Sequence, residues 1–60
     1  MKQVIILKEY SEHELQNQIN SWITANHKKY SILDIKFVGI DKGNHSDFAA
    51  MIIYEKKNSN

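Results

Sequence analysis

Apolar positions in the last third of the chain alternate in a way that predicts a strand buried on both faces. At period two, one side of residues 45–55 carries Phe48, Ala50, Ile52 and Tyr54, and the other carries Ala49, Met51 and Ile53. Because both sides are apolar, this strand is expected in the middle of a sheet, with cover over each face. The rest of the chain supplies only one helix, so we expect one sheet face to stay uncovered.

The helix is predicted between Tyr10 and His27. Ser11 and Glu14 have the spacing of a capping box, in which the hydroxyl accepts a hydrogen bond from the Glu14 amide. Asn26 or His27 is expected to end the helix in a left-handed conformation. One stripe of the helix is apolar and consists of Leu15, Ile19, Trp22 and Ile23. This spacing is typical of a helix that packs one face on a sheet.

The opposite face of the helix is polar but uncharged. It consists of Gln16, Asn17, Gln18, Asn20, Ser21 and Thr24. Solvated helix faces usually carry Lys and Glu, so this face could meet a partner or a polar ligand. The alternative is an ordinary solvated face whose composition reflects an AT-rich genome. The sequence leaves both interpretations open.

Two more strands are predicted, one on each side of the helix in the chain. Residues 2–8 alternate apolar side chains on both sides, and β-branched residues favour a strand over a short helix. Residues 30–41 also alternate, but Asp34 and Lys36 make one side half polar. Charged side chains of this kind discourage wrong pairing at a sheet edge, so this strand is expected at an edge.

The connections complete the predicted topology. Residues 41–46 predict a hairpin turn, because Gly43 and Asn44 can both adopt positive φ, and residues 56–60 predict a polar, frayed tail. A right-handed first crossover places the helix on one face and the third strand between the other two. The predicted fold class is therefore α+β, with β-α-β-β order and a three-stranded antiparallel sheet of order 1-3-2 carrying one helix on one face.

Length and charge limit the classes of protein that this chain can represent. Its 60 residues predict one domain, 1–60, and domains this small bury only about 60% of their unfolded surface and often need oligomerisation. We expect a homo-oligomer, a dimer or a multiple of dimers. The net charge is +1 and all eight basic residues are Lys, so the absence of Arg argues against sequence-specific nucleic-acid binding. Without Cys, a leader pattern or a long apolar run, a cytoplasmic location is expected, with no membrane partner.

Catalytic chemistry has few starting points in this sequence. There is no Cys and no Gly-x-Ser-x-Gly elbow, and the cap uses the Ser11 hydroxyl, so we expect no enzyme and no cofactor. Asp41, His45 and Asp47 surround one turn and could contribute metal ligands, but a flexible turn supplies no fixed second shell and a solvated loop is favoured. Trp22 could stack a base, although its place on the apolar stripe favours the core.

Three stretches of the chain, taken together, are similar to a known family. They are Lys2-Gln3-Val4, Ile32-Leu33-Asp34-Ile35-Lys36-Phe37 and Phe48-Ala49-Ala50-Met51-Ile52-Ile53-Tyr54-Glu55, the last being the most distinctive. They resemble very small sporulation-associated proteins of Bacillus-type Gram-positive bacteria, which have phage-encoded relatives. The resemblance covers nearly the whole chain, although this helix is less acidic than the family leads us to expect. It implies a context of expression and no catalytic residues.

The phage-encoded relatives suggest a function by analogy. Phages carry small oligomeric proteins that sequester nucleotide-derived immune signals of their hosts. We therefore expect a non-enzymatic homo-oligomer that binds a cyclic nucleotide or an ADP-ribose-like ligand. The alternative is a sporulation-associated protein-interaction or structural factor with no small ligand. The order of elements also resembles the flavin-binding dodecins, but no strand Trp matches their flavin-stacking residue, so no flavin is expected.

A ligand site is expected where protomers meet, because one protomer has no element to spare for a cleft. Rings near strand ends could stack a base, Lys could meet phosphate as a point charge, and the hairpin could supply polar contacts. On residue type and position, the candidates are Tyr10 and Tyr54 for stacking, Lys8 and Lys36 for phosphate, and Asn44 or His45 for polar contacts.

Overall fold

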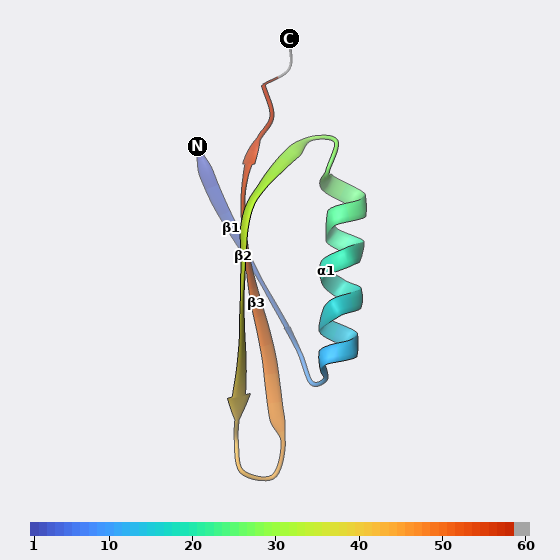
Figure 1. Cartoon of the computed structure of the whole chain (residues 1–60), viewed down its shortest axis with the longest axis vertical. Coiled ribbons are helices and arrows are strands. Elements are labelled where there is room, and N and C mark those ends of the chain that lie inside the picture. The colour runs from blue at the N-terminus through green and yellow to red at the C-terminus, as the bar shows by residue number, and fades with distance from the viewer. Residues whose placement is uncertain (59–60) are drawn as a thin grey trace.

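A computed structural model describes residues 1–58 and contains three strands and one helix in those residues (Figure 1). The elements are β1 (Lys2–Glu9), α1 (Glu12–Asn26), β2 (Tyr30–Asp41) and β3 (Ser46–Lys56). The chain is long and thin, with principal extents of 51 × 19 × 11 Å. The β2–β3 hairpin extends past the N-terminal end of α1, which lies along one side of the sheet.

The sheet confirms the predicted topology. Its order is β1-β3-β2, and β3 pairs antiparallel with both neighbours. Ala50 and Ile52, at the centre of β3, are buried. The central position of β3 is the outcome that its two apolar rows predict, and the buried pair belongs to the row that faces the helix.

The strand β2 lies at an edge, as its half-polar side predicts, and it contains one irregularity. Its register against β3 shifts between Ile32 and Asp34, so Leu33 is an extra residue in a β-bulge. The strict alternation predicted for residues 30–41 is therefore wrong at this position. A bulge changes the side on which the following residues fall, and it keeps Ile32 and Ile35, opposite Tyr54 and Ile52, on the same face of the sheet.

The start of α1 follows the prediction and its end does not. Ser11 is the N-cap, and its hydroxyl accepts a hydrogen bond from the Glu14 amide at 3.2 Å. The predicted left-handed stop is wrong, because the C-cap His27 has φ −62°. Asn26 instead closes the last turn, donating from its side chain to the Trp22 carbonyl at 2.8 Å. The backbone amides of His27 and Lys29 donate to the carbonyls of Ile23 and Asn26, at 2.8 and 3.0 Å, so the helix end is hydrogen-bonded without a left-handed cap.

The hairpin turn and the C-terminal segment differ slightly from the predictions. Gly43 has positive φ, 92°, but among residues 1–58 it is alone in this, so the same prediction for Asn44 is wrong. The strand β3 extends through Lys56, and the Lys57 amide donates to the Lys29 carbonyl at 2.9 Å. The predicted tail therefore begins later than residue 56, and its last two positions, 59–60, lie outside the described residues.

The helix packs over β1 and β3 and leaves β2 largely bare. Trp22 of α1 contacts Tyr54 with ring centroids 4.9 Å apart, so the row of β3 that contains Tyr54 faces the helix. Leu15 is the buried residue of α1 and packs into the same small core. No helix in residues 1–58 is long and apolar enough to span a membrane.

Candidate functional site

The sheet face opposite α1 carries exposed apolar side chains, and no helix or strand among the described residues covers it. In the register of the sheet, Val4 and Ile6 of β1 lie beside the central row of β3, with Val38 and Ile40 of β2 on its other side. These four side chains are exposed, Ile6 by 66%. We call this surface the open face. A shallow depression of about 250 Å³ lies on it between Ile6 and Val38, over Ala49.

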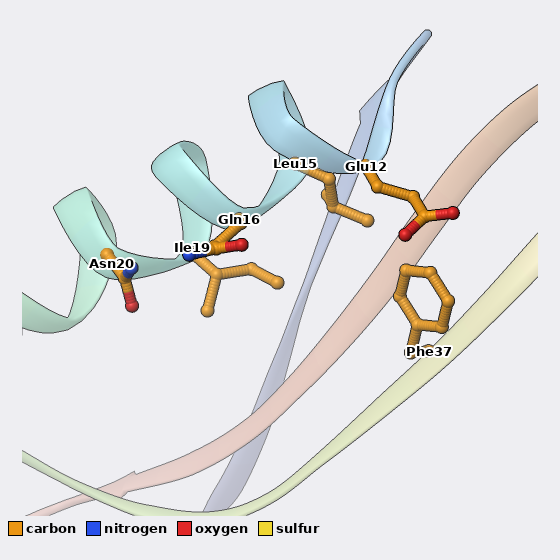
Figure 2. Close-up of a pocket in the computed structure, with 6 residues that line it drawn as sticks. All are labelled: Glu12, Leu15, Gln16, Ile19, Asn20 and Phe37. Carbon is orange, nitrogen blue, oxygen red and sulfur yellow. The ribbon is translucent and has the colours of Figure 1, made fainter.

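A second exposed surface lies between α1 and β2. Figure 2 shows this groove, in which Glu12 and the ring of Phe37 approach each other across the gap. Glu12, Gln16 and Asn20 recur every four residues along one edge of the helix, and Phe37 is 58% exposed. Because α1 packs on β1 and β3, this edge faces the bare part of β2. Two residues of the uncharged helix face therefore line a groove of about 220 Å³.

The hairpin end of the open face contains a buried carboxylate among positive groups. Asp47 is 1% exposed, and its Oδ2 lies 3.0 Å from Lys42 Nζ and 3.4 Å from Lys8 Nζ. His45 Nε2 lies 3.6 Å from Oδ1, which has no hydrogen-bond partner. The Lys42 ammonium holds the pKa of Asp47 below its ordinary value of 3.8, Lys8 adds to this effect, and burial opposes it.

This cluster is an ion-pair network. Asp41, the third residue of the predicted metal candidate, uses its Oδ1 to accept from the Gly43 amide at 2.9 Å. His45 Nδ1 lies 2.9 Å from the side-chain oxygen of Asn44. Within residues 1–58, no three His, Cys, Asp or Glu side chains come together to hold a metal ion.

The six residues predicted to bind a ligand lie in several places. Lys8 and His45 meet at Asp47, and Asn44 lies beside His45. Lys36 is elsewhere on the open face and pairs with Asp34 at 3.5 Å. The other two, Tyr10 and Tyr54, do not lie on the open face.

The two predicted tyrosines have different surroundings. Tyr10 is 75% exposed in the connection to the helix. Tyr54 is in an aromatic cluster on the helix side, 5.0 Å from Tyr30 and 4.9 Å from Trp22 between ring centroids. This arrangement confirms Trp22 as a packing residue and uses faces of the Tyr54 ring within the protein.

Sequence reasoning missed a group of lysines at the end of the sheet away from the hairpin. A cavity of about 520 Å³ is lined by Lys28, Lys29, Tyr30, Lys56, Lys57 and Asn58. We call this region the lysine end. The two Lys-Lys pairs are visible in the sequence, but they are far apart along the chain. The antiparallel pairing of Tyr30 with Lys56 brings them together.

Comparison of the chain with models of known protein families, with curated proteins and with solved structures found no match. The architecture and the side chains described above are therefore the basis for the function that follows.

Proposed function

We propose that this protein is a non-enzymatic homo-oligomer, a dimer or a multiple of dimers, that binds and sequesters a small nucleotide-derived ligand. The observation that carries the proposal is the open face. Val4, Ile6, Val38 and Ile40 are all more than a third exposed on one side of a sheet whose other side carries the helix. Contiguous apolar surfaces of this kind are characteristic of interaction sites.

The open face is large enough to support an interface between two copies. β3 has 11 residues and is about 35 Å long, and three strands are about 14 Å across, so the face has a projected area of about 500 Å². Side chains that stand out from the sheet increase its accessible area. The face is therefore comparable with the roughly 800 Å² per partner of a stable interface.

A second copy is the occupant that best fits the charges on this face. Lys36 is paired with Asp34 at 3.5 Å, and Lys8 with Asp47 at 3.4 Å, so these charged side chains beside the apolar rows are already neutralised within one chain. A partner of the same composition brings the same paired charges to the contact. Two-fold packing of identical faces is also the commonest form of assembly.

The ligand part of the proposal is supported by the lysine end. Four lysines line one cavity there, next to the ring of Tyr30. Positive side chains are suited to ligands that carry phosphate, as nucleotides do. The proposed ligand class is a cyclic nucleotide or an ADP-ribose derivative.

Calorimetric titration with cyclic dinucleotides and with cyclic and linear ADP-ribose derivatives tests the ligand part. We expect at least one of them to bind, and to raise the melting temperature because it binds only the folded state. If none of them binds, the sequestration role is contradicted. The open face then supports the second candidate, a sporulation-associated interaction or structural factor that uses the same apolar surface without a small ligand.

A further inference from the structure

We infer that the lysine end is an oligophosphate-binding site contained within one protomer, formed by Lys28 and Lys29 after the helix and Lys56 and Lys57 at the end of β3. The inference rests on the proposed binding of a nucleotide-derived ligand and names the chemical group of that ligand that the protein recognises. It differs from the expected position of the site, because the lysine end does not need a second copy to be complete.

The positive charge of the chain is concentrated at the lysine end. The whole chain has a net charge of +1, from eight lysines and seven acidic residues. Four of the eight lysines line this one cavity. The other four lysines and the seven acidic residues leave the rest of the chain with a net charge of −3. A nearly neutral protein therefore has one strongly positive end, which attracts anions to that end.

The lysines of the lysine end differ from three lysines elsewhere in the chain, which are neutralised by acidic side chains. Lys8 and Lys42 pair with Asp47, and Lys36 pairs with Asp34. Within residues 1–58, no acidic side chain forms an ion pair with any of the four lysines of the lysine end. Glu55 is next to Lys56 in the chain but falls on the other row of β3, opposite Lys2.

Helix capping explains only two of the four lysines at the lysine end. Lys28 and Lys29 follow the C-terminus of α1, where a positive charge stabilises the helix dipole. Lys56 and Lys57 belong to β3 and the segment after it, so the helix dipole does not account for them. The backbone bond from the Lys57 amide to the Lys29 carbonyl, 2.9 Å, holds the two pairs at one place.

The size and lining of the cavity indicate which part of a ligand it can bind. Its volume of about 520 Å³ is that of a small-molecule site, and Tyr30 and Asn58 add polar atoms to its wall. The Tyr30 ring already stacks with Trp22 at 6.3 Å and meets Tyr54 edge-on, so it is not free to hold a base. The site therefore recognises phosphate groups, and four lysines around one cavity can contact two or three adjacent phosphates.

Isothermal titration calorimetry of the whole chain with inorganic triphosphate at neutral pH tests this inference. We expect saturable binding that weakens as NaCl rises, because exposed charges are screened by salt. The double variant Lys29→Gln, Lys56→Gln is expected to bind about tenfold more weakly, since it loses two ammonium–phosphate contacts. The matched control Lys8→Gln, Lys36→Gln removes the same total charge from the open face and is expected to bind within about twofold of the original chain.

Melting curves of both variants confirm that they are folded. An equal loss of affinity in the two double variants would show attraction by net charge alone and overturn the inference, as would a larger loss in the control. Tighter binding of a single-stranded oligonucleotide than of triphosphate, at equal phosphate concentration, also overturns it. If triphosphate does not bind but a nucleotide does, this site is wrong and the proposed function stands.

Discussion

Asp47 is the residue whose charge is most strongly controlled by its neighbours. Its side chain is covered by other side chains at the hairpin end of the sheet, and Lys42 and Lys8 approach the same oxygen. A carboxylate in this position stabilises the fold only while it is ionised, because a protonated acid loses the attraction of both ammonium groups. The effect links the stability of the hairpin to pH.

The sign of that link gives a prediction. The pKa of Asp47 is lowered from 3.8 in the folded chain, so its contribution to stability is fully present above 3.8. That contribution is lost as the pH falls from 3.8 through the lower pKa of the folded state. Denaturant unfolding of the original chain and of Asp47→Asn should therefore show a stability difference that is constant near neutral pH and shrinks below 3.8.

Asp34→Asn is the matched control for this measurement. It removes an exposed carboxylate that pairs with Lys36, and exposed pairs contribute little to stability. A stability difference for Asp47→Asn that stays constant down to pH values well below 3.8 would show that the two lysines do not stabilise the ionised form.

Among the elements, α1 depends on a short stretch of contact. It packs over β1 and β3, and Leu15, which is 1% exposed, is its buried anchor. Ile23, nearer the C-terminus of the helix, is only half-buried. Leu15 therefore anchors the N-terminal half of the helix, where the Gln18 side chain also donates to Glu9 of β1, and the contact of Trp22 with Tyr54 anchors the C-terminal half.

Truncation of Leu15 tests this description of the helix. Leu15→Ala should cost about 2–5 kcal/mol, since it leaves a cavity in the core. A chain of 60 residues has a total stability of roughly 3–9 kcal/mol. The Leu15→Ala variant should therefore unfold at a much lower urea concentration than the original chain. Ile23→Ala is the matched control and should cost less. Equal losses in the two variants would contradict the assignment of Leu15 as the anchor.

The elements also show which structural features could be predicted from the sequence. The alternation in β3 and the Ser11–Glu14 spacing led directly to the central strand and the helix start, because both depend on neighbouring residues. The position of the helix end was predicted, but the right-handed conformation of His27 was missed, because hydrogen bonds of Asn26 and His27 end the helix instead of a left-handed cap. The bulge at Leu33 was missed because it is set by pairing with another strand. The lysine end was missed for the same reason: only strand pairing joins Lys28 and Lys29 to the end of β3.

At the scale of the whole molecule, one chain leaves the sheet incompletely covered. Figure 1, viewed down the shortest axis, shows the strands overlapping one another and α1 beside them, so the sheet and the helix form two layers. Within residues 1–58, nothing covers the open face, which is the side of the sheet away from α1. Assembly through this face would supply the missing cover for Val4, Ile6, Val38 and Ile40.

Assembly through the open face is tested most directly by the mass of the protein in solution. Light scattering at micromolar concentration should give at least twice the 7.0 kDa of one chain. Ile6→Lys places a charge on the β1 side of the open face and should reduce that mass to one chain. The control Tyr10→Lys, which replaces an exposed ring outside the open face, should keep the assembly. A mass of one chain for the unchanged protein would contradict the account.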